Sequence, residues 1–235
     1  MTRFALRTLP VALLVLSASI VRADEMPNND IPNNTFRIGE YWLFYHTYAS
    51  NLSGPFVPSD LNLTVKNVQT PYLAYLRRLS SNFTVELSFG VPPLTKTYGK
   101  GPATLGSVPY NGEEISSARW LAPTLLMQYV FLDDTYKLRP YFGVGLNYVV
   151  FYDRNSTPAG NAAAGGPTSI SLSNSIGPAV TAGLNYQITR NWSVSASYSA
   201  SRVQTQLDAH TGGVDRTSQI SFGPQTFVVA AGFSF

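Results

Sequence analysis

The end of the chain, from Gln225 to Phe235, alternates between two kinds of side chain. One face carries Phe227, Val229, Ala231, Phe233 and Phe235, and the other carries Val228, Ala230, Gly232 and Ser234. A period of two indicates a β-strand, because successive side chains point to opposite faces. A soluble protein would bury the aromatic-rich face, but the opposite face here is too small and mixed for an ordinary solvent-facing surface. Large apolar residues outward and small or polar residues inward are typical of a barrel strand that faces lipid.

The start of the chain has the organisation of an export signal. Arg3 and Arg7 precede a short apolar run, Leu9 to Leu16, and Val21-Arg22-Ala23 forms a cleavage site. The run is far shorter than the roughly 20 residues that a spanning helix needs, which argues against a membrane anchor. No later stretch is long and apolar enough to span as a helix. The predicted division is a signal peptide at 1–23, a periplasmic segment at 24–34 and a barrel domain at 35–235.

Composition narrows the class of protein further. Charged residues make up 12% of the chain, about half the share in typical soluble domains, and aromatic residues reach 13%. The formal net charge of +3 comes from Arg3, Arg7 and Arg22 in the signal, which leaves 13 basic residues against 13 acidic ones. A balanced chain without a basic patch indicates no nucleic-acid partner. The absence of cysteine excludes a small fold held by disulfides.

Strand-like segments recur along the chain and are separated by turn signals. They cover about 36–48, 67–79, 83–91, 119–131, 138–152, 174–188, a segment that begins at Trp192, and the final strand. Short turns alternate with long loops, which lie around 51–58, 94–115, 153–171 and 208–217. We therefore predict an all-β fold, an eight-stranded antiparallel transmembrane β-barrel with short periplasmic turns and longer extracellular loops. The first segment is rich in Tyr, Phe and Trp, and its facing is ambiguous.

Several stretches in the second half of the chain carry a family pattern. They are Arg139 to Tyr148, Ala122 to Leu125, Ala182 to Tyr186 followed by Thr189 to Trp192, and Ala231 to Phe235. Together they resemble the OmpW family, specifically from Trp120 onward and loosely from Phe36, and the first two strands depart most from the pattern. The resemblance implies a barrel in the outer membrane of a Gram-negative bacterium that conducts small hydrophobic molecules and releases them sideways into the lipid. It also implies that the outer-membrane assembly machinery reads the terminal aromatic residue, Phe235.

Inward-facing positions predict an apolar region near the outer end of the lumen. The side chains that are predicted to face inward near the outer ends of their strands are Trp120, Leu126, Val149, Phe151, Val203 and Phe222. The periplasmic halves of the strands instead offer Gly143, Gly145, Ser193, Ser195, Gly232 and Ser234. An apolar cavity is typical of a site for small hydrophobic ligands, and Trp120 is the predicted constriction. Ordinary packing of a narrow barrel explains the same pattern, a bulge would reverse the facing, and Trp120 could instead belong to an interfacial aromatic girdle.

Glu86 is predicted to face inward from the third strand. A carboxylate in a narrow lumen needs a cationic partner or water. Arg77 or Arg78 on the neighbouring strand is the expected source of that charge. Since buried charges are usually paired, the first interpretation is a structural ion pair of the lumen. A polar plug or an ion path is the functional alternative.

No pattern in the sequence indicates catalysis, a cofactor or a metal. His46 and His210 are the only histidines, and no nucleophile motif, metal-ligand spacing or phosphate loop accompanies them. Analogy with small barrels that modify lipids is the remaining enzyme hypothesis. We expect an outer-membrane barrel that passively admits small hydrophobic molecules through an apolar outer lumen, with lateral exit into the membrane. Two other classes stay open: a structural or interaction protein with partner-binding loops and a closed core, and a small ion-conducting pore.

Overall fold

The computed structural model of the chain describes residues 31–45, 47–58 and 60–235. The predicted signal peptide at 1–23 lies outside the described residues, as do His46 and residues 24–30 of the predicted periplasmic segment. Within the described ranges, no helix has the length and the apolar character needed to cross a bilayer.

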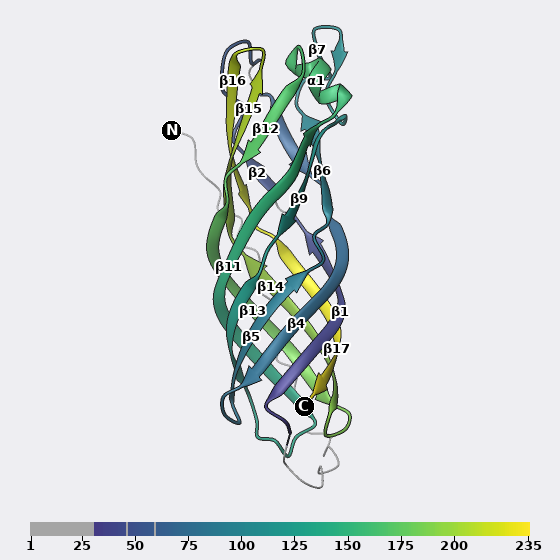
Figure 1. The fold of residues 1–235 in the computed structure, drawn as a ribbon, viewed down its shortest axis with the longest axis vertical. Coiled ribbons are helices and arrows are strands. Elements are labelled where there is room, and N and C mark those ends of the chain that lie inside the picture. Colours follow the sequence, from purple (N-terminus) through teal and green to yellow (C-terminus); the bar gives the residue numbers. More distant parts are fainter. Residues whose placement is uncertain (1–30, 46, 59) are drawn as a thin grey trace, which may run out of the picture.

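Eight antiparallel strands close into a barrel, which confirms the predicted fold class. In chain order they are β1 (Asn34–Phe44), β4 (Val68–Arg78), β5 (Phe83–Gly90), β10 (Thr124–Val130), β11 (Leu138–Ser156), β13 (Ser175–Gln187), β14 (Trp192–Ser201) and β17 (Gln225–Ser234). Each strand pairs with the next in this order, and β17 pairs back with β1, so the ring is closed. Short turns and the C-terminus lie at one end of the barrel, and the longer connections lie at the other (Figure 1).

Side chains alternate across the barrel wall as the sequence predicts. On β17, Phe233 is 42% exposed on the outer surface, whereas the neighbouring Ser234 is 2% exposed. The same alternation runs along β5, β10 and β13. In a bilayer the outer apolar surface contacts hydrocarbon, and it is stable there because the backbone polar groups are paired within the closed sheet.

The structure defines the facing of β1, which the sequence leaves ambiguous. Phe36 and Ile38 point outward, and Arg37 and Tyr41 are buried inside the barrel. This strand therefore delivers a cation and an aromatic hydroxyl to the lumen.

Much of the chain that we expected to form polar loops is β-structure, so that part of the prediction is wrong. The loop expected at 94–115 contains β6 (Leu94–Lys100), the hairpin of β7 (Thr104–Leu105) and β8 (Val108–Pro109), and the start of β9 (Glu114–Leu121). β6 pairs with β9 and with β3 (Asn62–Val65), and β9 pairs with the outer part of β11. The strand expected at 119–131 is divided into β9 and β10 at Ala122 and Pro123, because proline has no N–H to donate to a sheet.

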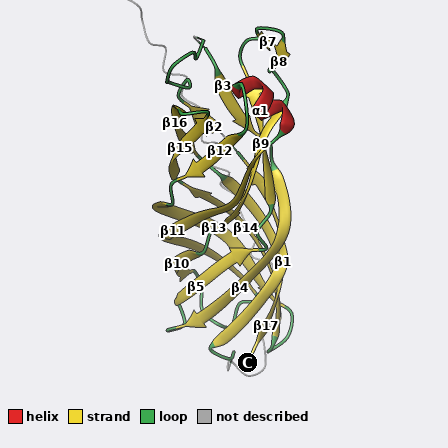
Figure 2. Ribbon diagram, turned by 45° about the horizontal axis from the view of Figure 1, so that its top comes forward, coloured by secondary structure: helices red, strands yellow, loops and turns green. Residues whose placement is uncertain are grey.

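The strands β3, β6 and β9 form the first outer sheet. A second outer sheet contains β12 (Thr168–Leu172), β15 (Val203–Thr211), β16 (Val214–Phe222) and β2 (Thr47–Ala49). It replaces most of the loop expected at 208–217 and part of the loop expected at 153–171, which also holds α1 (Pro158–Ala164). Leu207 and Ile220 of this sheet pack together with Leu63 of β3. This shared apolar core joins the two outer sheets beyond the end of the barrel, where α1 also lies (Figure 2).

Candidate functional site

The outer half of the barrel encloses a cavity, and the residues predicted for the apolar outer lumen and the lumen charge line it. They are Trp120, Leu126, Val149, Phe151, Val203, Phe222 and, toward the periplasmic end, Glu86. The cavity holds about 1430 Å³ of space between protein atoms, part of it open to solvent. Barrel strands supply its lower wall, and β3, β6, β9 and the second outer sheet supply its upper wall.

The upper wall of the cavity is mainly apolar, although β6 and β9 also contribute hydroxyl side chains to it. Val149, Val203 and Trp120 belong to one buried cluster, against which Phe151 and Phe222 pack. Inward alternation brings these side chains together from strands that are far apart in the sequence. Transfer of a small apolar molecule from water onto such a wall is favourable by about 25 cal/mol per Å² of apolar surface removed from water. The wall is therefore suited to hydrophobic ligands.

Trp120 lies inside the cavity and is 8% exposed. Its Nε1 donates a hydrogen bond of 2.8 Å to Thr95 Oγ1 on β6. A buried indole usually needs such a partner, and the bond fixes the ring across the cavity. The aromatic-girdle alternative does not fit this position, because a girdle residue would face the lipid.

A polar cluster around Glu86 forms the floor of the cavity. The Glu86 carboxylate, 4% exposed, accepts hydrogen bonds from Tyr72 Oη at 2.8 Å and from Gln128 Nε2 at 2.7 Å. Arg37 Nη1 lies 3.4 Å from Glu86 Oε2, and Arg37 Nη2 donates to Asn185 Oδ1 at 3.0 Å. Several charge-assisted bonds of this kind offset the cost of burying two ions.

The expected partners of Glu86 are wrong, because Arg37 provides the charge. Arg77 is exposed and donates to Asn34 Oδ1 at 2.6 Å. Arg78 lies at the turn end of β4 and pairs with Asp134. Arg37 was missed because the sequence leaves the facing of β1 ambiguous. Its position between Phe36 and Ile38, which are both apolar, was nevertheless a sequence signal for an inward side chain.

Many aromatic and apolar residues of the cavity wall were missed in the sequence, and three of them come from one place in the chain. Tyr41, Leu43 and Tyr45 all face the cavity from β1 and the residue after it. The rings of Tyr41 and Tyr72 meet edge to face, with centroids 6.3 Å apart. Bulky side chains occupy both faces of this strand, so alternation alone did not separate them.

The remaining chemistry-bearing groups do not gather at the cavity. His210 Nδ1 lies 2.6 Å from Asp215 Oδ1, and both side chains are exposed on the hairpin of β15 and β16. In the part of the chain that the structure describes, no group of His, Cys, Asp and Glu side chains could hold a metal ion.

An eight-stranded barrel with a lipid-facing outer surface and an enclosed lumen is an integral protein of the Gram-negative outer membrane. The chain belongs to the OmpW family, because the sequence profile of that family matches residues 45–235. This family is not enzymatic.

Known relatives agree with this assignment. Outer membrane protein W of Vibrio cholerae is 28% identical over 187 residues, which cover 76% of this chain and 83% of that protein. Outer membrane protein W of Salmonella typhimurium is 34% identical over 122 residues, covering 52% of this chain and 57% of that protein. The chain therefore matches little more than half the length of the Salmonella protein. Outer membrane protein AlkL of Ectopseudomonas oleovorans is 27% identical, covering 79% of this chain and 73% of that protein.

Solved structures show the same fold. The crystal structure of the outer membrane protein OprG from Pseudomonas aeruginosa has a TM-score of 0.77 at 18% identity, covering 91% of this chain and 98% of that chain. The solution structure of outer membrane protein W of E. coli has a TM-score of 0.54 at 26% identity, covering 87% and 98% respectively.

Proposed function

We propose that this protein gives small hydrophobic molecules passive passage across the outer membrane through its apolar outer cavity. The single observation that carries the proposal is a cavity with an apolar upper wall, a polar floor and an opening toward solvent. Apolar molecules cross the polar outer leaflet slowly, and a protein-lined path bypasses that barrier. No energy source or cofactor is required.

The floor of the cavity supports an exit through the wall in place of an exit at the periplasmic end. Arg37, Gln128 and Tyr141 are buried below the cavity, and Arg37 lies over the Tyr141 ring at 5.8 Å from its centroid. An apolar molecule gains nothing by entering this ion-paired region, because it would separate groups that are hydrogen-bonded.

The wall beside β5 offers a place for that exit. Pairing of β5 toward β10 ends at Ser88, its last backbone bond toward β4 runs from Val91 N to the Pro71 carbonyl at 3.0 Å, and sheet pairing resumes with β6 at Leu94. Pro92 and Pro93 between these points have no N–H, so they donate no backbone hydrogen bond to a neighbouring strand. We therefore assign the lateral exit to this weakly paired stretch, which borders the cavity.

The test is uptake of a small apolar compound into cells or liposomes that contain the protein. Trp120→Ala is expected to change the uptake rate, because it removes the constriction. Trp192→Ala is the matched control, since Trp192 is 52% exposed on the outer surface, and it is expected to leave the rate unchanged. An unchanged rate in Trp120→Ala, with the barrel intact by gel mobility with and without boiling, would contradict the constriction. Unaltered uptake after deletion of the gene would favour the interaction-protein alternative.

A further inference from the structure

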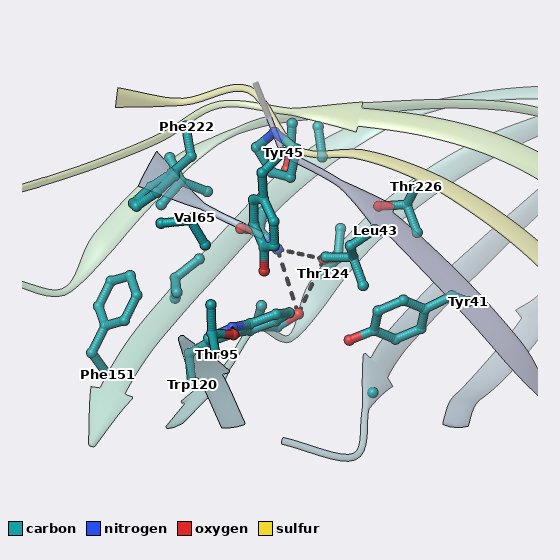
Figure 3. Close-up of a pocket in the computed structure, with 18 of the residues that line it drawn as sticks. Tyr41, Leu43, Tyr45, Val65, Thr95, Trp120, Thr124, Phe151, Phe222 and Thr226 are labelled. Atoms are coloured by element: carbon teal, nitrogen blue, oxygen red, sulfur yellow. Dashed lines mark hydrogen bonds between the residues drawn. The ribbon is translucent and has the colours of Figure 1, made fainter. Parts of the chain in front are cut away.

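The hydroxyl of Tyr41 points into the cavity without a hydrogen-bond partner among the residues that the structure describes (Figure 3). The Tyr41 side chain belongs to a residue that is only 6% exposed. Two neighbouring polar side chains of the cavity are partnered: Trp120 donates to Thr95, and Asn147 Nδ2 donates to Thr124 Oγ1 at 2.7 Å. Polar groups inside a protein are normally hydrogen-bonded, so a hydroxyl that faces the cavity without a protein partner is open to a bond from whatever occupies the cavity.

The position of the Tyr41 hydroxyl is built into the barrel. Its ring packs edge to face on Tyr72, which is itself held by Glu86. Gly90 on β5 leaves the space for the oxygen, because a Cβ at Gly90 would lie 2.1 Å from Tyr41 Oη. The hydroxyl is therefore held at the boundary between the polar floor and the apolar wall.

Whether the Tyr41 hydroxyl gains a hydrogen bond depends on whether the ligand carries a polar atom. A bare hydrocarbon that fills the cavity displaces water and leaves the phenol unpaired, which costs binding free energy. A hydrocarbon that carries one oxygen can place its chain on the apolar wall and its oxygen on Tyr41. A neutral group suits this position, because Arg37 already neutralises Glu86 in the floor below.

We propose that Tyr41 makes the cavity select apolar molecules that carry one neutral hydrogen-bonding oxygen, such as medium-chain alcohols, over bare hydrocarbons of the same length. This inference rests on the proposed function and names the ligand class of the same cavity. Tyr41 is the specificity-determining residue, and the upper wall accepts the chain of either kind of molecule.

The test uses Trp120 as a reporter inside the cavity. The chain has three tryptophans, so Trp42→Phe and Trp192→Phe leave Trp120 as the only one, which is excited selectively at wavelengths that tyrosine does not absorb. The full chain in lipid nanodiscs is titrated with 8-bromo-1-octanol and with 1-bromooctane, whose bromine quenches a nearby indole. The readout is the ratio of the two apparent dissociation constants, which is compared between variants in the same lipid so that partitioning into the membrane cancels.

Tyr41→Phe is expected to reduce the preference for the alcohol about tenfold, which corresponds to about 1.4 kcal/mol, while 1-bromooctane binds as before. Gly90→Ala, which displaces the hydroxyl without removing it, is expected to lower the preference in the same direction. Tyr198→Phe, on the outer surface, is the matched control and is expected to leave the ratio unchanged. Gel mobility with and without boiling confirms that each variant is folded.

Two results overturn the inference, and they can be told apart. If both compounds quench Trp120 and Tyr41→Phe leaves their ratio unchanged, Tyr41 does not select the ligand, although the cavity still binds hydrophobic molecules. If neither compound quenches Trp120 in any variant, the cavity is not a ligand site and the proposed function fails as well.

Discussion

Arg37 Nη1 lies 3.4 Å from Glu86 Oε2 inside the lumen, although their strands, β1 and β5, are separated in the sheet by β4. The pair therefore spans the inner face of β4, and Arg37 reaches farther across the lumen to Asn185 of β13 through its Nη2. Both side chains are almost completely buried, at 7% and 5% exposure. The first two predictions follow from this arrangement.

Loss of Arg37 should destabilise the barrel strongly. Arg37→Ala leaves the Glu86 carboxylate buried without its cation, and removal of one partner of a buried pair costs about 3–5 kcal/mol. The measurement is the free energy of unfolding in urea for the protein folded in liposomes. Arg119→Ala is the control, because the exposed pair of Arg119 with Asp153 should contribute at most about 1 kcal/mol. Equal losses in both variants would contradict a buried floor that stabilises the barrel.

The same floor should keep the barrel closed to ions. The wild-type chain in a planar bilayer is expected to give no steady single-channel current, because hydrogen-bonded side chains fill the lumen at Glu86. The double variant Arg37→Ala, Glu86→Ala removes both ions and is expected to conduct more. A wild-type current as large as that of the double variant would favour the ion-pore alternative.

The outer sheets should be sensitive to alkaline pH through Tyr110. Burial raises the pKa of the Tyr110 phenol to about 12 from its ordinary value of 10.0, and its hydroxyl donates to the Asn62 carbonyl at 2.9 Å. Between pH 10 and pH 12 the phenol ionises in the unfolded state but not in the folded one, so its contribution to stability is present below pH 10 and is lost as the pH rises toward 12. The difference in phenolate absorbance between wild type and Tyr110→Phe should titrate near pH 12. A midpoint near pH 10 would contradict the buried position.

Phe235 should matter more for assembly in cells than for the stability of the finished barrel. Its ring stacks on Phe36, with centroids 5.8 Å apart, but it is half exposed on the lipid side. Phe235→Ala is expected to lower the amount of folded barrel in the outer membrane several-fold, while the purified chain still refolds in lipid. Phe233→Ala is the control with the same facing. Equal amounts of folded protein for Phe235→Ala and wild type in the membrane fraction would contradict recognition by the assembly machinery.

The barrel could be predicted from the sequence because its lipid-facing side chains must be apolar, and they alternate with inward-facing ones along each strand. Alternation on β17, β5 and β10 separates bulky outward residues from small or polar inward ones, and the structure follows it. The facing of β1 could not be predicted in this way, because Tyr41, Trp42 and Leu43 are all bulky. Only pairing with β4 and β17 fixes which of them faces the lumen.

The outer sheets were not predicted, for a different reason. In β15, Val203, Thr205 and Leu207 alternate with polar residues, which is a strand signal in the sequence, but the glycines and charges of the following turn suggested a loop. Sheet formation there depends on packing partners such as Leu63, which come from distant parts of the chain. Tyr41 was missed with the rest of β1, so the sequence indicated an apolar cavity but not its free hydroxyl.

The central claim is that hydrophobic molecules enter the cavity and do not merely dissolve in the surrounding lipid. The most direct measurement is the nuclear Overhauser effect from protonated n-octane to protein methyl groups, with the chain in nanodiscs of perdeuterated lipid. Val149 and Val203 line the cavity and are 4% and 5% exposed, whereas Leu146 and Leu184 face the lipid and are 55% and 47% exposed. Contacts from octane to the methyl groups of Val149 and Val203 are predicted. Contacts confined to Leu146 and Leu184 would contradict the claim.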